Sequence, residues 1–272
     1  MIDRTGLLAD YHRLREVGRS LHNRLIKQIP KPVLTSSAER LGLLSPGPSR
    51  HGEEVLLLED EYEISVLMDY CLYHGRQGRD GRTVIEQAIA EAPPAAGSDE
   101  QLVLMAMQSV RFSAFAVEAA ASGVGVQVRD LLRDELLFLV DIGFSQTAAP
   151  GLVLAGNVIS LPGLSMTTGA MLPVDRTILE DLLQRLPGRF ATATVGQFRQ
   201  FSPNEQSELA GFVIHACLAR GAATYVEARD VKTGLSPPLP HGSRPKAARR
   251  HPRNAPCPCG SGQKYKRCCG RR

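Results

Sequence analysis

Residues 123–143 read GVGVQVRDLLRDELLFLVDIG, and they set the fold class of the chain. The segment holds two short runs, VGVQVRDLL and ELLFLVDIG, in which apolar residues cluster or alternate with polar ones. Two similar runs, GLVLAGNVISL and LSMTTGAMLPV, follow at residues 151–161 and 164–174. Because Gly, Pro and polar turn residues separate them, these runs predict three or four antiparallel strands that form a small sheet or barrel.

The chain in front of these strands, residues 1–122, is predicted to be mainly helical, because its apolar residues recur at helical spacing. Two prolines after residue 29 are expected to stop the first helix, and Ser36 or Ser37 to cap the second. The last helix of this part is almost uniformly apolar, which is typical of the buried centre of a bundle. The predicted helices cover residues 3–29, part of 35–44, 59–73, 83–92 and 98–121.

Two more helices are expected after the strands, in VDRTILEDLLQRL and FSPNEQSELAGFVIHACLAR. In the second of them, Ser202 is placed to cap the helix and Pro203 to occupy its first position. A Pro-rich, basic stretch without apolar periodicity follows at residues 236–253, and we interpret it as a flexible tether. The fold class is therefore α+β, with a small module after the tether.

The composition is that of an ordinary globular protein: 43% of the 272 residues are hydrophobic and 22% are charged. The chain is long enough to bury a sizeable core, and no apolar run approaches the roughly 20 residues that span a bilayer. The first twenty residues are charged throughout and lack the apolar core of a signal peptide. We therefore expect a cytoplasmic, reducing location in which structural disulfides are improbable.

The charges are distributed unevenly along the chain. It has 32 Lys and Arg against 28 Asp and Glu, but ten of the basic residues and none of the acidic ones lie in residues 241–272. The rest of the chain, residues 1–240, thus carries 22 basic and 28 acidic side chains. An acidic body with a basic tail suggests that the tail contacts something anionic, although such a charge run can also serve only to keep the tail solvated.

Four of the six cysteines lie in the stretch APCPCGSGQKYKRCCG, residues 255–270. A disulfide between adjacent cysteines would be strained, and a catalytic dithiol is normally Cys-x-x-Cys on a folded scaffold. Four thiolates instead close the tetrahedral coordination sphere of Zn²⁺, and the binding energy replaces the missing hydrophobic core. The predicted zinc ligands are Cys257, Cys259, Cys268 and Cys269.

The same residues resemble the SEC-C motif, a zinc-binding tail best known from the preprotein-translocase motor ATPase. Arg253, Asn254, the Cys-Pro-Cys-Gly-Ser-Gly run and the closing Cys-Cys-Gly all match that pattern. The resemblance covers about 18 residues. It implies a zinc-held docking module, which in the translocase contacts a chaperone and the ribosome. We expect its contact surface to consist of Lys264, Tyr265, Lys266 and Arg267.

The remaining chain shows no recognisable catalytic set. It contains no G-x-x-x-x-G-K-[ST] phosphate loop, and Gly123 and Gly125 lack the third glycine of a dinucleotide site. Cys71 and His74 share a helix face, and we expect a half-buried thiol beside an exposed imidazole. The hydroxyl residues of LSMTTGA are expected to be ordinary turn and sheet residues.

These observations predict a zinc-binding adaptor whose C-terminal module docks on a protein or ribosomal partner. Two alternatives stay open: a nucleic-acid or ribosome-associated factor with a basic tail, and an enzyme of unrecognised class that the tail recruits. We expect four parts, of which the first two form one globular unit. They are a helical region (1–122), a sheet or barrel with helices (123–230), a linker (231–252) and the zinc module (253–272).

Overall fold

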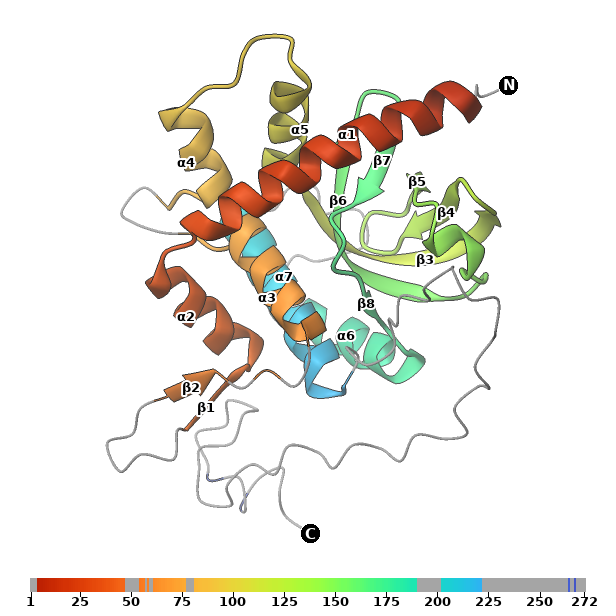
Figure 1. The fold of residues 1–272 in the computed structure, drawn as a ribbon. Helices are drawn as coiled ribbons and strands as arrows, with labels where there is room; N and C mark the ends of the chain where they lie inside the picture. Colours follow the sequence, from red (N-terminus) through yellow and green to blue (C-terminus); the bar gives the residue numbers. More distant parts are fainter. Residues whose placement is uncertain are drawn as a thin grey trace.

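The computed structural model describes the chain over residues 4–46, 54–56, 58, 61–76, 81–189, 202–221, 264 and 267. In these ranges six helical segments precede the central sheet. The first of them is amphipathic and buries Leu14, Leu21 and Leu25 on its apolar face. None of the helices in these ranges is both long and apolar enough to cross a membrane. The segments are α1 (Arg4–Leu25), η1 (Ile26–Gln28), α2 (Lys31–Leu41), α3 (Glu61–Tyr73), α4 (Val84–Glu91) and α5 (Asp99–Gln108) (Figure 1).

The second helix begins earlier than Ser36 or Ser37, so that prediction is wrong. Pro30 occupies the N-cap of α2 and a second proline lies within its first turn. Proline is tolerated there because the first N–H groups of a helix have no intrahelical acceptor in any case. The helix ends at Gly42, whose φ of 72° is left-handed. A short antiparallel ribbon that the sequence did not predict follows, made of β1 (Leu44–Pro46) and β2 (Glu54–Leu56).

The helix predicted over residues 98–121 is also wrong in its second half. Ser98 caps α5 at the start of the predicted helix, but α5 ends at Gln108 and strand β3 (Arg111–Ala121) replaces the rest. The alanines of this segment suit a helix, yet Phe112, Phe115 and Val117 give it β-forming side chains. Since β3 is hydrogen-bonded to a strand on each side, sheet pairing prevails over the local preference.

The central sheet confirms the predicted strands and closes on itself. Its order is β3-β4-β5-β7-β6-β8, and β3 also pairs with β6, so that five of the strands form a small barrel. All the pairs are antiparallel except β5 with β7, which is parallel. The remaining strands are β4 (Gly125–Asp130), β5 (Glu135–Val140), β6 (Val153–Leu161), β7 (Leu164–Thr167) and β8 (Leu172–Pro173).

Two helices after the sheet, α6 (Arg176–Arg189) and α7 (Pro203–Ala219), confirm the predicted pair. Ser202 and Glu205 form a capping box at the start of α7, with Pro203 in its first turn. Helices α3 and α7 lie side by side next to the barrel (Figure 1), and Tyr70 donates a hydrogen bond from α3 to the Ser207 carbonyl of α7.

The hydrophobic core consists of three clusters that meet at α3 and β6. One cluster joins α2, α3, α6 and α7, a second joins α1, α4 and α5, and a third fills the barrel. Helix α3 contributes to the first two, and strand β6 contributes to all three. Polar groups between α3 and β6 are therefore enclosed by apolar side chains, where the energetic consequences of an unpaired group are largest.

Candidate functional site

A chain of polar side chains joins α3 to the centre of β6. Asn157 on β6 donates from Nδ2 to Asp69 Oδ2 at 2.7 Å, and its Oδ1 lies 2.9 Å from His74 Nε2. Each of these three residues is no more than 5% exposed. Asn157 pairs with Phe112 in the ladder between β6 and β3, so the sheet fixes the position of its amide. Its two partners, Asp69 and His74, lie near the end of α3 and directly after it. We call this arrangement the α3–β6 polar chain.

His74 is buried, so the predicted exposed imidazole is wrong. Its ring packs against Tyr70 and edge-on against Phe112, with centroids 5.4 Å and 5.9 Å away. Burial lowers the pKa of His74 to about 4, although the hydrogen bond with Asn157 raises it in part. The ring is thus neutral at pH 7. An ionised Asp69 requires the amide nitrogen of Asn157, which leaves the amide oxygen to accept from His74 Nε2–H.

Within the α3–β6 polar chain, the Asp69 carboxylate has the fewest hydrogen bonds for its burial: one oxygen accepts from Asn157, and the other has no regular hydrogen bond within the described residues. Burial raises its pKa to about 6, while Asn157, Thr168 and the positive charge of Arg15 lower it only in part. Asp69 Oδ1 and Thr168 Oγ1 are both buried, and neither forms a hydrogen bond of regular geometry within the described part of the chain. Such groups are rare in native proteins and call for an explanation at each site. The α3–β6 polar chain therefore combines the neutral imidazole of His74 with the Asp69 carboxylate, whose pKa is about 6.

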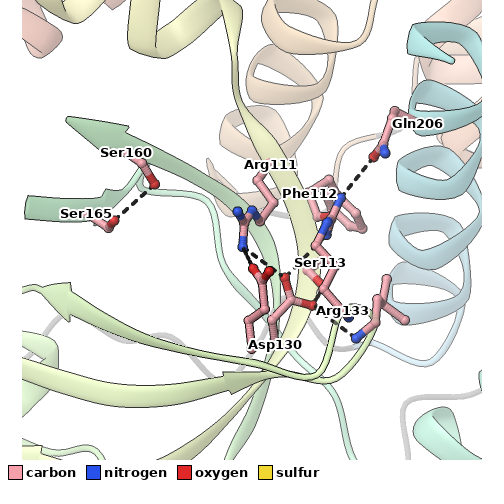
Figure 2. A network of polar contacts seen from close by, with 10 residues as sticks. Arg111, Phe112, Ser113, Asp130, Arg133, Ser160, Ser165 and Gln206 are labelled. Carbon is pink, nitrogen blue, oxygen red and sulfur yellow. Dashed lines mark hydrogen bonds and ion pairs between the residues drawn. The ribbon is translucent and has the colours of Figure 1, made fainter. Parts of the chain in front are cut away.

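A second buried carboxylate, Asp130, shows the opposite situation (Figure 2). It accepts hydrogen bonds from the Ser113 hydroxyl and from two main-chain N–H groups at 3.0 and 3.1 Å, and it pairs with Arg133 at 3.3 Å and Arg111 at 3.6 Å. Arg133 continues to the Gln206 side chain on α7 at 3.4 Å. This fully partnered network ties the barrel to α7, and we assign it a structural role.

Cavities lie inside the barrel and between the helices of the described part of the chain. One of about 170 Å³ lies inside the barrel and is mostly apolar, with Arg15, Tyr62 and Asp141 among its polar lining. Another, of about 230 Å³, is polar and lies between α2, α3 and α7, where His74 reaches its wall. A pKa near 4 makes His74 a weak general base at neutral pH, so this geometry favours binding or positioning over proton abstraction.

The predicted zinc ligands Cys257, Cys259, Cys268 and Cys269, with Tyr265 and Lys266, lie outside the described residues. Lys264 and Arg267 are described; both are exposed, and the Arg267 N–H donates to the Lys264 carbonyl at 2.8 Å.

The two other cysteines are poor metal ligands. Cys71 and Cys217 are buried as free thiols, and burial raises their pKa to about 11 and about 12, respectively. Within the described ranges no three His, Cys, Asp or Glu side chains form a metal-binding group. By its chemistry, the four-cysteine set of the tail fits Zn²⁺.

The polar chain is the part of the site that the sequence analysis missed. One signal for it was present: Asn157 is a single amide within the apolar run GLVLAGNVISL. A buried strand rarely carries such a residue unless a partner satisfies it. The hydroxyl residues of LSMTTGA were predicted as turn and sheet residues, which is confirmed for Ser165 and Thr167 of β7. Their neighbour Thr168 lies beside Asp69 instead of on an open turn.

The features described so far define an α+β body built around a small closed sheet, with a cysteine-rich motif near the end of the sequence. A model described as a family of unknown function (DUF7986) matches residues 6–199, more than half of the chain, and the chain therefore belongs to this family. The SEC-C motif model matches residues 253–271, which confirms the resemblance found in the sequence. A search of curated proteins and a search of solved structures give no match.

Proposed function

We propose that the chain is an adaptor whose C-terminal SEC-C module binds Zn²⁺ and docks on a protein or ribosomal partner. The observation that carries this proposal is the SEC-C match over residues 253–271, which includes all four tail cysteines. In this proposal Cys257, Cys259, Cys268 and Cys269 hold the metal. Residues 231–252 form the tether that lets the module reach its target while the body stays separate.

The electrostatics of the tail support the same assignment. Four thiolates around one Zn²⁺ leave a local charge of about −2, which nearby cations would partly neutralise. Lys264 and Arg267 are both exposed, and a main-chain hydrogen bond joins them. In this proposal they supply part of that positive charge and contact the partner. Tyr265 and Lys266 complete the proposed contact surface. Thiolate ligands also require a reducing environment, and a cytoplasmic location is part of the proposal.

Zinc analysis of the purified full-length protein tests the metal. We expect one zinc per chain, and a variant with Cys257→Ser and Cys259→Ser should lose it. Cys71→Ala is the matched control, because that thiol is buried in the body and should leave the zinc content unchanged. Absence of zinc from the wild-type protein, or full retention in the double variant, would contradict the proposal.

A pull-down tests the docking role. The full chain and a chain truncated after Asp230 are compared for the partners they retain. Partners lost on truncation depend on the tail, and the double cysteine variant should lose the same partners if zinc organises the contact surface. If the truncated chain keeps every partner, the tail is not the docking element.

The charge distribution favours a second candidate, in which the basic tail contacts nucleic acid. Ten Lys and Arg without an acidic residue in 241–272 would displace counterions from phosphates, so affinity should fall steeply with salt. Measuring RNA binding by the full and truncated chains at several salt concentrations separates the two candidates. RNA binding that is unchanged by the truncation at low salt would exclude the nucleic-acid reading.

A further inference from the structure

A pocket of about 130 Å³ lies between α1 and the side of the barrel formed by β6 and β7. Its α1 wall consists of residues at the spacing of one helical face, and its opposite wall combines apolar side chains with Thr168. The α1 residues are Arg15, Gly18, Arg19, His22 and Asn23. We call this cavity the α1 pocket.

The arginines of the α1 pocket differ from the other arginines of the same helix. Arg13 and Arg24 each form an ion pair with an acidic side chain at the start of α5. Arg15 instead donates to the Thr167 main-chain carbonyl, and no ion pair of Arg15 occurs within the ranges that the structure describes. The only carboxylate paired with Arg19 there lies one turn away at 4.0 Å, and both side chains are more than two-thirds exposed. Water screens such a contact strongly.

The pocket therefore concentrates positive charge and hydrogen-bond donors without a carboxylate among its described lining residues. Arg15 is half-buried, and it lies close enough to Asp69 to lower the pKa of that carboxyl without forming an ion pair with it. Burial and then the charge of Arg15 lower the pKa of His22, which keeps the imidazole neutral and able to hydrogen-bond. Thr168 adds a buried hydroxyl that lies beside Asp69 and has no hydrogen bond of regular geometry among the described residues.

Guanidinium groups form bidentate hydrogen bonds with tetrahedral and planar oxyanions, and hydroxyl and amide groups complete such sites. A volume of about 130 Å³ is roughly ten times the space that one water needs, so the pocket admits a group of several heavy atoms. Its apolar wall suits the organic part of a ligand more than a bare ion. These properties together identify the class of ligand.

We propose that the α1 pocket binds the phosphoryl group of a small phosphorylated molecule, with Arg15 and Arg19 as the charged contacts and Thr168 as a hydroxyl contact. Arg15 is held in place for this role by its bond to the Thr167 carbonyl. The site lies in the body and is separate from the zinc module. It therefore adds a ligand to the adaptor and does not depend on the tail.

Calorimetric titration of the full chain at constant ionic strength tests the proposal, with three probes: inorganic phosphate, adenosine monophosphate and adenosine. Arg19→Gln is the first variant because its exposed side chain is not needed for folding. Thr168→Val and Arg15→Gln follow, checked for folding by circular dichroism. The matched control is Arg24→Gln, on the same helix but outside the pocket and paired with Glu100.

We expect saturable binding of the phosphorylated probes and about tenfold or more weaker binding in Arg15→Gln, as for loss of a charge-assisted hydrogen bond. Arg19→Gln and Thr168→Val should weaken binding as well, and Arg24→Gln should not. Tighter binding of adenosine monophosphate than of phosphate indicates an ester, and equal binding indicates recognition of the phosphoryl group alone; both support the proposal. No saturable binding, equal binding of adenosine, or affinities unchanged in Arg19→Gln and Thr168→Val would overturn it.

Discussion

Replacing Asp69 by Asn should change how the stability of the fold depends on pH. Asn keeps an oxygen that can accept the hydrogen bond from Asn157 Nδ2, so the substitution removes the titrating group and preserves the contact. The effect follows from two buried groups of the α3–β6 polar chain. The pKa of Asp69 is raised and the pKa of His74 is lowered. Asp69 titrates near 6 instead of 3.8, and His74 near 4 instead of 6.5.

The two groups act in opposite directions over the same pH range. The raised pKa of Asp69 means that the folded state binds its proton more tightly, so stability is lost as pH rises from about 4 to 6, by about 3 kcal/mol. The lowered pKa of His74 means that the unfolded state takes up the proton first. Stability is therefore lost as pH falls from 6.5 to about 4, also by about 3 kcal/mol. In the wild type these two contributions nearly cancel.

Urea unfolding followed by circular dichroism between about pH 3 and pH 7 measures the effect, provided that the slope with denaturant is unchanged. We expect the stability of Asp69→Asn minus that of the wild type to be about 3 kcal/mol more positive above pH 6 than below pH 4. The variant itself should then lose stability steeply in acid, because His74 is no longer compensated. Asp10→Asn, on an exposed carboxylate of α1, is the control and should give a flat difference. A flat difference for Asp69→Asn as well would refute the reasoning.

Three further predictions concern the fold and the tail. Asp130→Ala should cost about 3–5 kcal/mol in urea unfolding, since Arg133 loses its buried partner; a loss below 1 kcal/mol would contradict the structural role given to this network. Gly42→Ala should destabilise more than Gly81→Ala, because both have positive φ but only at Gly42 does an added Cβ meet a neighbouring ring; equal unfolding midpoints would argue against that contact. Cys268→Ser should lower the zinc content by metal analysis while the melting temperature of the body stays unchanged, and a lowered melting temperature would indicate that the metal also holds the body.

The sequence predicted the fold well where one local pattern decides the structure. The capping residue Ser202 and the strand runs after residue 123 lie where the sequence predicts them. It failed at β3, where alanine-rich sequence suits a helix and only pairing with β4 and β6 selects a strand. Such pairing depends on residues that are far away in the chain, and a local pattern does not contain it.

The candidate sites were harder to predict for a related reason. His74 was expected to be exposed on a helix face, yet the closed barrel places Asn157 against it. The lack of an ion pair for Arg15 in the described part of the chain is equally invisible in the sequence, since Arg13 and Arg24 differ from it only in facing α5. The SEC-C motif is the contrasting case, because its four cysteines lie within thirteen residues, Cys257 to Cys269, and their spacing alone carries the signal.

Burial by itself does not separate functional from structural polar groups in this protein. Asp130 is fully buried and every part of its carboxylate is engaged, so its network stabilises one arrangement of the barrel. Asp69 Oδ1 and Thr168 Oγ1 are buried beside each other, and neither forms a hydrogen bond of regular geometry within the described ranges. Arg15 nearby has a charge that no described carboxylate neutralises at contact distance. Leaving several such groups unsatisfied in one place is unfavourable for folding, and proteins retain that arrangement mainly where a ligand or a reaction uses it. The acidic body therefore contains a local basic site at α1, and this site is where we propose that a ligand binds.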